Sequence, residues 1–173
     1  MATEIISRLR TVSTTKACAA AGDYAAEDVI SESAAEGTAW TFTNVVDREG
    51  QSGVIVMAEV LCETTALTHK LSLYLYNATP TCVLNDNVAN TGVLHADAAK
   101  YIGRIDFPAL EDLGGDSEAV ATPSTYGNLP LAFVTATASR SIYGVLVTRD
   151  AITGETATDD YIIRLTVEQA TKV

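Results

Sequence analysis

Hydrophobic and polar residues alternate with a period of two in several short segments of this chain, and this alternation predicts β-strands. The clearest segment is residues 71–77, in which every second residue from Leu71 is a leucine. The leucine face predicts contact with a core. The opposite face carries Tyr74 and Tyr76, whose hydroxyls we expect to reach water or a partner.

The same pattern extends over much of the chain. Further strands are predicted at residues 4–11, 38–46, 54–63, 101–107, 129–135, 141–149 and 160–168. Residues 54–63 and 141–149 are apolar at nearly all positions, which is typical of strands covered on both faces. Trp40 and Phe42 lie at alternate positions of one strand, so we expect both rings in the core.

Two stretches are predicted to be irregular. Residues 78–99 are rich in turn signals, with a short helix expected near residues 96–100, and a loop of that length usually has a function or a partner. Residues 114–127 are expected to form a smaller polar loop. Eight or nine strands joined by turns and two long loops predict an all-β fold class, a two-sheet antiparallel β-sandwich with jelly-roll connectivity. Residues 1–173 are expected to form one domain, with residues 1–11 as an N-terminal arm or an edge strand.

Charge and hydropathy exclude several classes of partner. The chain has 22 acidic and 11 basic residues, a formal net charge of -11, and its Lys and Arg residues form no run. Nucleic acid is therefore an unexpected ligand, because binding to phosphates needs clustered cations. No apolar segment approaches the roughly 20 residues that span a bilayer, and no secretory signal is visible, so we expect no membrane partner and synthesis in a cytoplasm.

Residue types that carry catalysis form no recognised arrangement. The three cysteines have no CxxC spacing, and Cys62 is expected to be a buried free thiol. Only two histidines occur, His69 and His95, and no sequence motif for a hydrolase, a zinc site or a nucleotide site is present. We therefore expect a protein that is not an enzyme, with no catalytic residues and no cofactor.

Acidic residues in turns leave calcium as one metal ion that the chain could bind. Asp86, Asp112 with Asp116, and Asp159 with Asp160 each lie where a loop could offer oxygen ligands to calcium. None has the order of an EF-hand loop, so we assign no metal ligand. The default reading of these residues is solvated turns.

Two segments carry a resemblance to a known class. The sequences DAAKYIGRIDFPALEDLGG at residues 97–115 and SIYGVLVTR at residues 141–149 resemble small virion structural proteins of tailed bacteriophages. In size and texture the chain is most similar to capsid decoration, or cement, proteins. The resemblance implies a β-sandwich on the outer surface of the virion capsid that stabilises it. It also implies the major capsid protein or another virion protein as the partner, a homo-oligomer such as a trimer, and synthesis in the host cytoplasm.

The expected partner contacts are Ile5, Ile6 and Leu9, because an N-terminal segment of this kind can add as a strand to a neighbouring sheet. Residues 78–99 are a second expected contact region. Two other functions stay open, namely a tail, neck or other phage virion component, and a carbohydrate-binding module of jelly-roll type.

Overall fold

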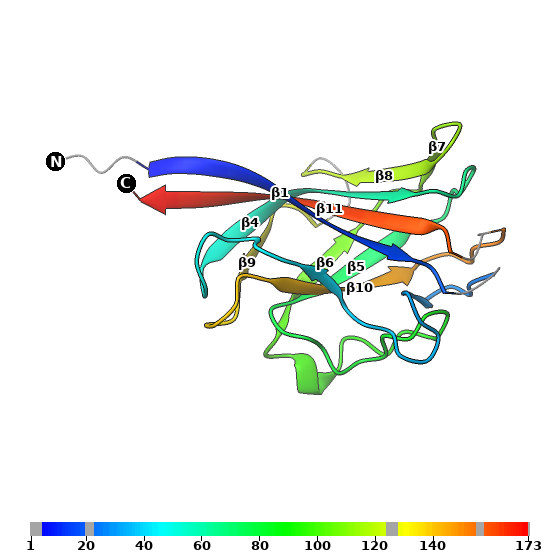
Figure 1. Cartoon of the computed structure of the whole chain (residues 1–173), viewed down its shortest axis with the longest axis horizontal. Coiled ribbons are helices and arrows are strands. Elements are labelled where there is room, and N and C mark those ends of the chain that lie inside the picture. Colours follow the sequence, from blue (N-terminus) through cyan, green and yellow to red (C-terminus); the bar gives the residue numbers. More distant parts are fainter. Residues whose placement is uncertain (1–4, 20–22, 124–127, 155–157, 173) are drawn as a thin grey trace.

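Two antiparallel β-sheets pack face to face in the computed structural model, which describes residues 5–19, 23–123, 128–154 and 158–172 (Figure 1). The side chains of residues 5–7 and 170–172 lie outside this description. The arrangement confirms the predicted two-sheet β-sandwich.

Each sheet is built from strands distant in sequence. The six-stranded sheet contains β1 (Ile5–Ala17), β11 (Asp160–Lys172), β4 (Ser52–Cys62), β8 (Ser117–Ala121) and β7 (Glu111–Asp112) in that order, with β9 (Leu131–Val134) also paired to β4. The five-stranded sheet contains β2 (Val29–Ile30), β10 (Ile142–Thr148), β5 (Leu71–Tyr76) and β6 (Tyr101–Asp106), with β3 (Trp40–Phe42) also paired to β10.

The pairing is that of a jelly roll. Four antiparallel pairs nest inside one another along the chain: β5 with β6, β4 with β8 and β9, β10 with β2 and β3, and β1 with β11. The nested strip then closes on itself, because β11 also pairs with β4 and β10 also pairs with β5. The jelly-roll connectivity expected from the sequence is therefore present.

The inward faces of both sheets form the main core. Trp40 and Phe42 are buried there, as predicted, and the Trp40 indole N–H donates to the Ile30 carbonyl at 3.0 Å. The leucine face of β5 is buried in the same cluster, and the Cys62 thiol is buried as expected. Alternation along a strand thus identified the inward face correctly.

The outward face of β5 is also buried, so the prediction that Tyr74 and Tyr76 reach solvent or a partner is wrong. A second apolar cluster covers them. Its buried members are Val29, Tyr74, Tyr76, Cys82, Val145 and Val147, and Val83, Leu84, Leu94 and Tyr101 pack against it. Much of this cluster comes from residues 78–94, which fold back over the five-stranded sheet. We call these residues the cover loop.

Buried carboxylates hold the cover loop in place. Asp86 accepts hydrogen bonds from the Ser31 N–H at 2.6 Å and from the Tyr24 hydroxyl at 3.0 Å. Asp97 follows the loop in the short helix η1 (His95–Asp97), one turn of 3₁₀ helix where residues 96–100 were expected to be helical. Burial opposes its ionisation, but the Thr81 N–H and hydroxyl and the Lys100 ammonium outweigh burial and lower the pKa of Asp97.

One expected loop contains a strand. Residues 114–127 were predicted to be a polar loop, but Ser117–Ala121 forms β8 against β4. The inward positions of β8 carry only serine and alanine, so a hydropathy pattern gives almost no signal there. Small side chains are required because the facing layer is already filled by larger ones.

Candidate interaction surface

The six-stranded sheet has an outward face that no described part of the chain covers. One set of alternate positions on β4, β8 and β11 is buried in the core, and the other set stays partly exposed. The outward positions of β1, β7 and β9 continue this set across the sheet, and we call all of them together the outer apolar face. Its large apolar members are Leu9, Val54, Met57, Leu61, Val120, Val134 and Ile162.

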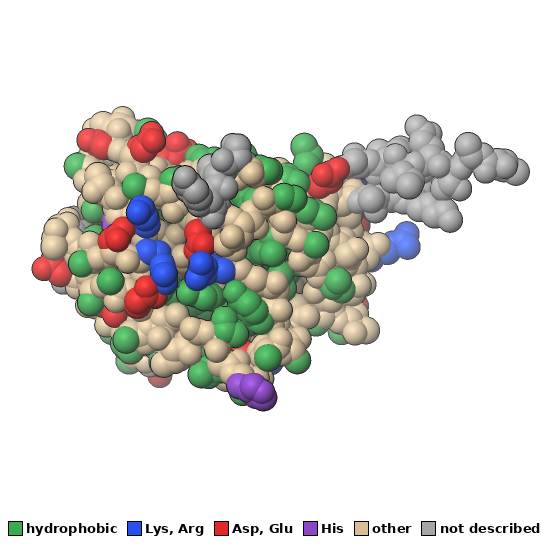
Figure 2. Space-filling view, turned by 180° about the vertical axis from the view of Figure 1, so that it is seen from behind, with side chains coloured by type: hydrophobic (Ala, Val, Ile, Leu, Met, Phe, Trp, Pro, Cys, Tyr) green, Lys and Arg blue, Asp and Glu red, His purple; other side chains and the backbone are tan. Residues whose placement is uncertain are grey.

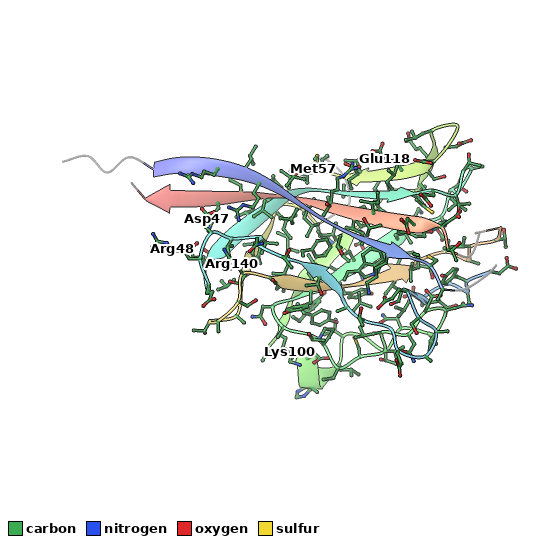
Figure 3. All side chains as sticks on the ribbon, viewed as in Figure 1. Asp47, Arg48, Met57, Lys100, Glu118 and Arg140 are labelled. Carbon is green, nitrogen blue, oxygen red and sulfur yellow. The ribbon has the colours of Figure 1, made fainter. Side chains whose placement is uncertain are left out.

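The strand register shows that these side chains share one side. Leu9 is opposite Glu168, Glu168 is opposite Val54, and Val54 is opposite Ala132, so one row crosses four strands. Near the other end of the sheet, Ile162 is opposite Leu61. Directly opposed residues point to the same side of a sheet. In Figure 3, Met57 and Glu118 lie on the side of this sheet that faces away from the second sheet.

Charge is sparse on the outer apolar face although the whole chain is strongly acidic. Glu59 and Arg164 are directly opposed and form an ion pair, which neutralises both near the middle of the face. Glu111, Glu118 and Glu168 are its other described carboxylates, and Thr11, Ser13 and Thr15 occupy its β1 positions. A flat apolar patch with few charges has the composition found at the centres of protein interfaces.

Comparison of two strands shows that this exposure is specific to one sheet. The sequences of β4 and β10 both predicted cover on both faces. For β10 this is confirmed, because the main core lies under one face and the cover loop lies over Val145 and Val147. For β4 only the inward face is buried, and Val54 and Leu61 keep partial exposure. The chain itself covers one sheet and leaves the other uncovered.

The chain ends form a ribbon that extends beyond the body of the sandwich (Figure 1). Residues 5–8 pair with residues 169–172, past the last pair between β11 and β4, so this part of β11 is paired only to β1. The backbones of Ile5 and Ile6 lie in this ribbon, whereas their side chains are outside the described residues. The Leu9 side chain begins the outer apolar face and is 70% exposed.

Strand β1 is the edge strand of its sheet and carries only positive charge. Its basic residues are Arg8, Arg10 and Lys16, and it has no acidic residue. Arg10 donates to the carbonyls of Asn44 and Val46. Arg8 and Arg10 also pair with the Asp47 carboxylate. These two ties of β1 to a neighbouring loop, to backbone carbonyls and to a carboxylate, run through side chains and leave the backbone edge of β1 unpaired by any described strand.

The third tie involves Lys16, which pairs with Glu32 and lies 5.4 Å from the Trp40 ring centre. Burial lowers the pKa of Lys16, with Glu32 opposing the change. Burial also opposes ionisation of Glu32, but hydrogen bonds from Lys16, Ser31 and Thr38 outweigh it and lower the pKa of Glu32 to about 2. The desolvation cost at Lys16 offsets part of the stabilisation of the Glu32 carboxylate. The pair therefore contributes only modestly to the free energy of unfolding.

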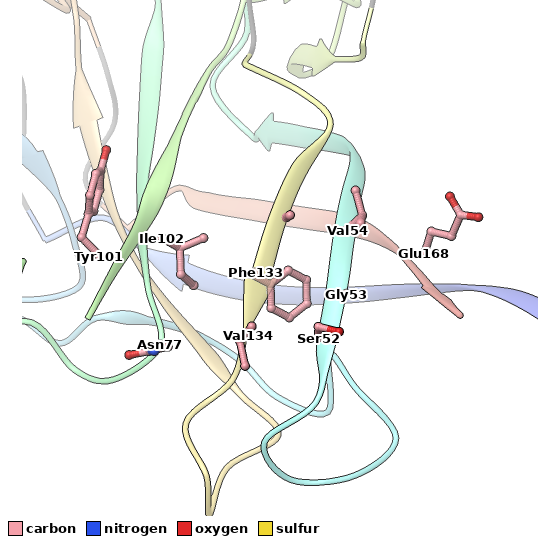
Figure 4. A pocket seen from close by; sticks show the side chains of 10 residues that line it. Ser52, Gly53, Val54, Asn77, Tyr101, Ile102, Phe133, Val134 and Glu168 are labelled. Atoms are coloured by element: carbon pink, nitrogen blue, oxygen red, sulfur yellow. The ribbon is translucent and has the colours of Figure 1, made fainter. Parts of the chain in front are cut away.

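A shallow groove of about 520 Å³ lies where the ribbon meets the body. Figure 4 shows that β4, β6, β9 and β11 all contribute side chains to it. Phe133 lies against Gly53, where an added Cβ would come within 2.9 Å of the ring. The groove wall includes Val54 and the 54% exposed Val134, so it continues the outer apolar face.

Several side chains of the types that catalyse reactions or bind metals are buried or hydrogen-bonded within the protein. Burial lowers the pKa of His69 to about 4, and the side chains of Cys18, Cys62 and Cys82 are buried. Asp112 accepts from the Thr65 hydroxyl and the Gly114 N–H, and Asp159 accepts from the Thr64 hydroxyl. Within the described ranges, no three His, Cys, Asp or Glu side chains cluster as a metal site would require.

No helix in the described part of the chain is long and apolar enough to cross a membrane.

No protein-family model matches the chain, and no curated protein matches it. Among solved structures, the chain is similar to one from Desmodium yellow mottle tymovirus, with 10% identity and a TM-score of 0.32. The match covers 100% of this chain and 90% of that chain. A likeness at this identity and TM-score carries no assignment of function.

Proposed function

We propose that this protein is a non-enzymatic structural component of a tailed-phage virion that binds the outer surface of the assembled capsid and stabilises it. The observation that carries the proposal is the outer apolar face, which is left uncovered while the opposite sheet is covered by the chain's own loop. Its partner in this proposal is the major capsid protein, and it occupies the capsid surface as a homo-oligomer, with a trimer as the first stoichiometry to test.

Physical chemistry supports assembly rather than catalysis. Jelly rolls occur in capsid proteins, lectins and cupins, so the fold alone selects none of these functions. The apolar side chains of this face gain free energy when they lose water to a partner, and its few glutamates outside the Glu59–Arg164 pair would lie at the rim of the contact or meet a cation of the partner. A two-stranded ribbon is marginally stable by itself, so the paired chain ends also gain from docking on a neighbouring sheet.

The direct test is co-sedimentation of the purified protein with capsid shells assembled from the coat protein encoded nearest its gene. The proposal predicts saturable binding at a fixed number of copies per coat subunit. Leu61→Lys and Ile162→Lys place charges in the outer apolar face, and each is expected to weaken binding by about tenfold or more, since a buried unpaired charge costs over 1.4 kcal/mol. Circular dichroism and thermal unfolding check that both variants fold.

The matched control is Val88→Lys. Val88 is 39% exposed on the opposite sheet, in the second expected contact region, so it receives the same change in charge away from the outer apolar face; Thr41→Lys, at an exposed position of β3 outside both expected regions, is a second control. Binding by both controls is expected to stay at the wild-type level. Wild-type binding by both outer-face variants would refute the assignment of this face.

The expected contacts Ile5, Ile6 and Leu9 are tested by shortening the ribbon. Deletion of residues 2–10 would also remove Arg10, which ties β1 to the carbonyls of Asn44 and Val46. Deletion of residues 2–8 spares that tie and removes most of the ribbon pairing. The shortened protein should fold and lose shell binding, and retained binding would exclude the ribbon as a contact.

A tail or neck component is the alternative virion role. It would use the same face and ribbon on a different partner, so binding to assembled tails without binding to shells would select it. Neither outcome changes the prediction that lysines on the outer apolar face weaken assembly.

A further inference from the structure

The outward side of the five-stranded sheet holds a pocket just beyond the area under the cover loop. The pocket has a volume of about 300 Å³ and is lined by the start of β5 and by the ends of β6 and β10. Pro108 is the exposed apolar residue of its lining, whereas Leu71 and Phe107 are buried in the main core beneath it. A volume of this size is at the lower end of the range for small-molecule sites.

Three cations line the pocket, namely Lys70, Arg104 and Arg149, with Asp106 as the one carboxylate in its lining. They are more than a quarter of the 11 basic residues in a chain of net charge -11. Figure 2 shows Lys and Arg side chains gathered beside acidic ones on one side of the molecule, next to an apolar area. The charge of the pocket therefore differs from that of the chain as a whole.

The carboxylate of Asp106 is already satisfied. Its Oδ1 lies 2.7 Å from Arg104 Nε and accepts from the Ser72 hydroxyl at 2.5 Å. Its Oδ2 accepts from Arg104 Nη2 at 2.8 Å and from the Asn128 amide at 2.9 Å. Asp106 and Arg104 therefore neutralise each other, and the remaining charge in the lining comes from Lys70 and Arg149.

Lys70 and Arg149 are directly opposed across the two strands. The Arg149 N–H donates to the Lys70 carbonyl at 2.8 Å, one step past the pair between Leu71 and Thr148. Directly opposed like charges destabilise a sheet, and this cost is reduced here by Glu27 and by the Asp150 carboxylate, which accepts from the Lys70 N–H at 3.1 Å. Glu27 accepts from Arg149 at 2.6 Å, whereas the Lys70 ammonium has no hydrogen-bond or ion-pair partner among the described residues.

We propose that this pocket binds an organic carboxylate with an apolar body. The carboxylate would lie between the Lys70 ammonium and the Arg149 guanidinium and relieve their repulsion. Its apolar part would replace water against Pro108. A free small acid and an acidic side chain of another protein offer the same chemistry, so the test includes a probe for each source.

The test is titration of the full-length protein with benzoate, followed by amide NMR and calorimetry. Benzamide, which has the same shape without the charge, is the matched ligand control. Saturable shifts of the amides of residues 70–72, 106 and 107 are expected with benzoate and not with benzamide. Equal affinity for the two ligands, or no saturable binding of benzoate or of the peptide probe below, would overturn the proposal.

Variants assign the binding to the two cations. Lys70→Gln is expected to weaken benzoate binding at least about tenfold, the effect of one lost hydrogen bond to a charged group. Glu27→Gln frees Arg149 from its competing carboxylate and is expected to tighten binding. Arg48→Gln removes one positive charge from the turn before β4, away from this pocket (Figure 3), and is the control for the change in net charge.

Two results separate a built site from general electrostatics. Equal weakening by the Arg48 and Lys70 variants, or no gain from the Glu27 variant, would refute the assignment. The peptide probe is acetyl-leucyl-glutamyl-leucine amide. Tighter binding of this peptide than of benzoate assigns the carboxylate to a protein partner, and the reverse order assigns it to a free acid.

Discussion

The buried imidazole of His69 makes the stability of this protein depend on pH in a defined window. His69 lies just before β5, is 6% exposed, and its Nε2 has no hydrogen-bond partner among the described residues. Burial lowers its pKa to about 4, and the nearby carboxylate of Asp150 opposes the change only in part. The folded protein therefore holds the imidazole neutral at pH values where an unfolded chain would begin to protonate it.

The sign and size of the effect follow from linkage. An unfolded histidine titrates near 6.5, so between about pH 6.5 and pH 4 the unfolded state binds more protons and stability falls as the pH falls. A difference of about 2.5 between the two pKa values, at 1.36 kcal/mol each, corresponds to about 3 kcal/mol. For a domain of this size that lowers Tm by about 6–12 °C.

The measurement is urea unfolding between pH 7 and pH 5, above the range in which most carboxylates titrate. About 2 kcal/mol of the total should be lost in this interval. His69→Gln should flatten the dependence, whereas His95→Gln, at the exposed second histidine, should leave it unchanged. An NMR titration of the wild-type imidazole reports the pKa without any mutation. A His69 pKa near 6.5, or an unchanged slope in the His69 variant, would refute the reasoning.

Three further predictions concern packing, charge and thiol access. Gly144→Ala would place a Cβ 2.7 Å from Leu73 Cδ1 and should cost about 1–3 kcal/mol in urea unfolding, while Gly115→Ala, with open space around it, should cost nothing; equal stabilities would contradict this. Glu32, with its pKa lowered to about 2, stabilises the fold above about pH 4.5, and this is lost as the pH falls toward 2. Glu32→Gln should therefore cost about 1 kcal/mol at neutral pH and give a shallower acid limb, and an unchanged limb would exclude the role. Burial raises the pKa of the Cys82 thiol, so labelling by a thiol reagent should be slow until urea is added, and rapid labelling of the folded protein would contradict the cover-loop packing.

The outer apolar face connects these features to the proposed role. Val145 and Val147 of β10 receive their cover from within the chain, whereas Val54 and Leu61 of β4 do not. Both strands have apolar residues at both sets of alternate positions, so their sequences are alike in this respect. The difference arises because one loop folds back on one sheet, and the uncovered sheet is where we propose that another protein binds.

The local sequence was sufficient to predict the inward face of the strands at residues 38–46 and 71–77. Alternation is a property of neighbouring residues, so Leu71, Leu73 and Leu75, and likewise Trp40 and Phe42, were assigned to the core without knowledge of the partner strands. The β-sandwich followed from the number of such strands and the turns between them. The short strand β8 escaped detection because its inward positions carry only small side chains.

Contacts between residues far apart in the chain were decided only by the tertiary structure. Tyr74 and Tyr76 are buried because the cover loop packs on them, and Lys70 meets Arg149 because β5 pairs with β10. The local sequence pattern does not predict either contact. Residues on the outward side of a strand alternate with the core-facing residues in the same way whether a loop or water covers that outward side. Periodicity therefore determines which residues share a side of a strand, and the path of the rest of the chain determines what covers that side.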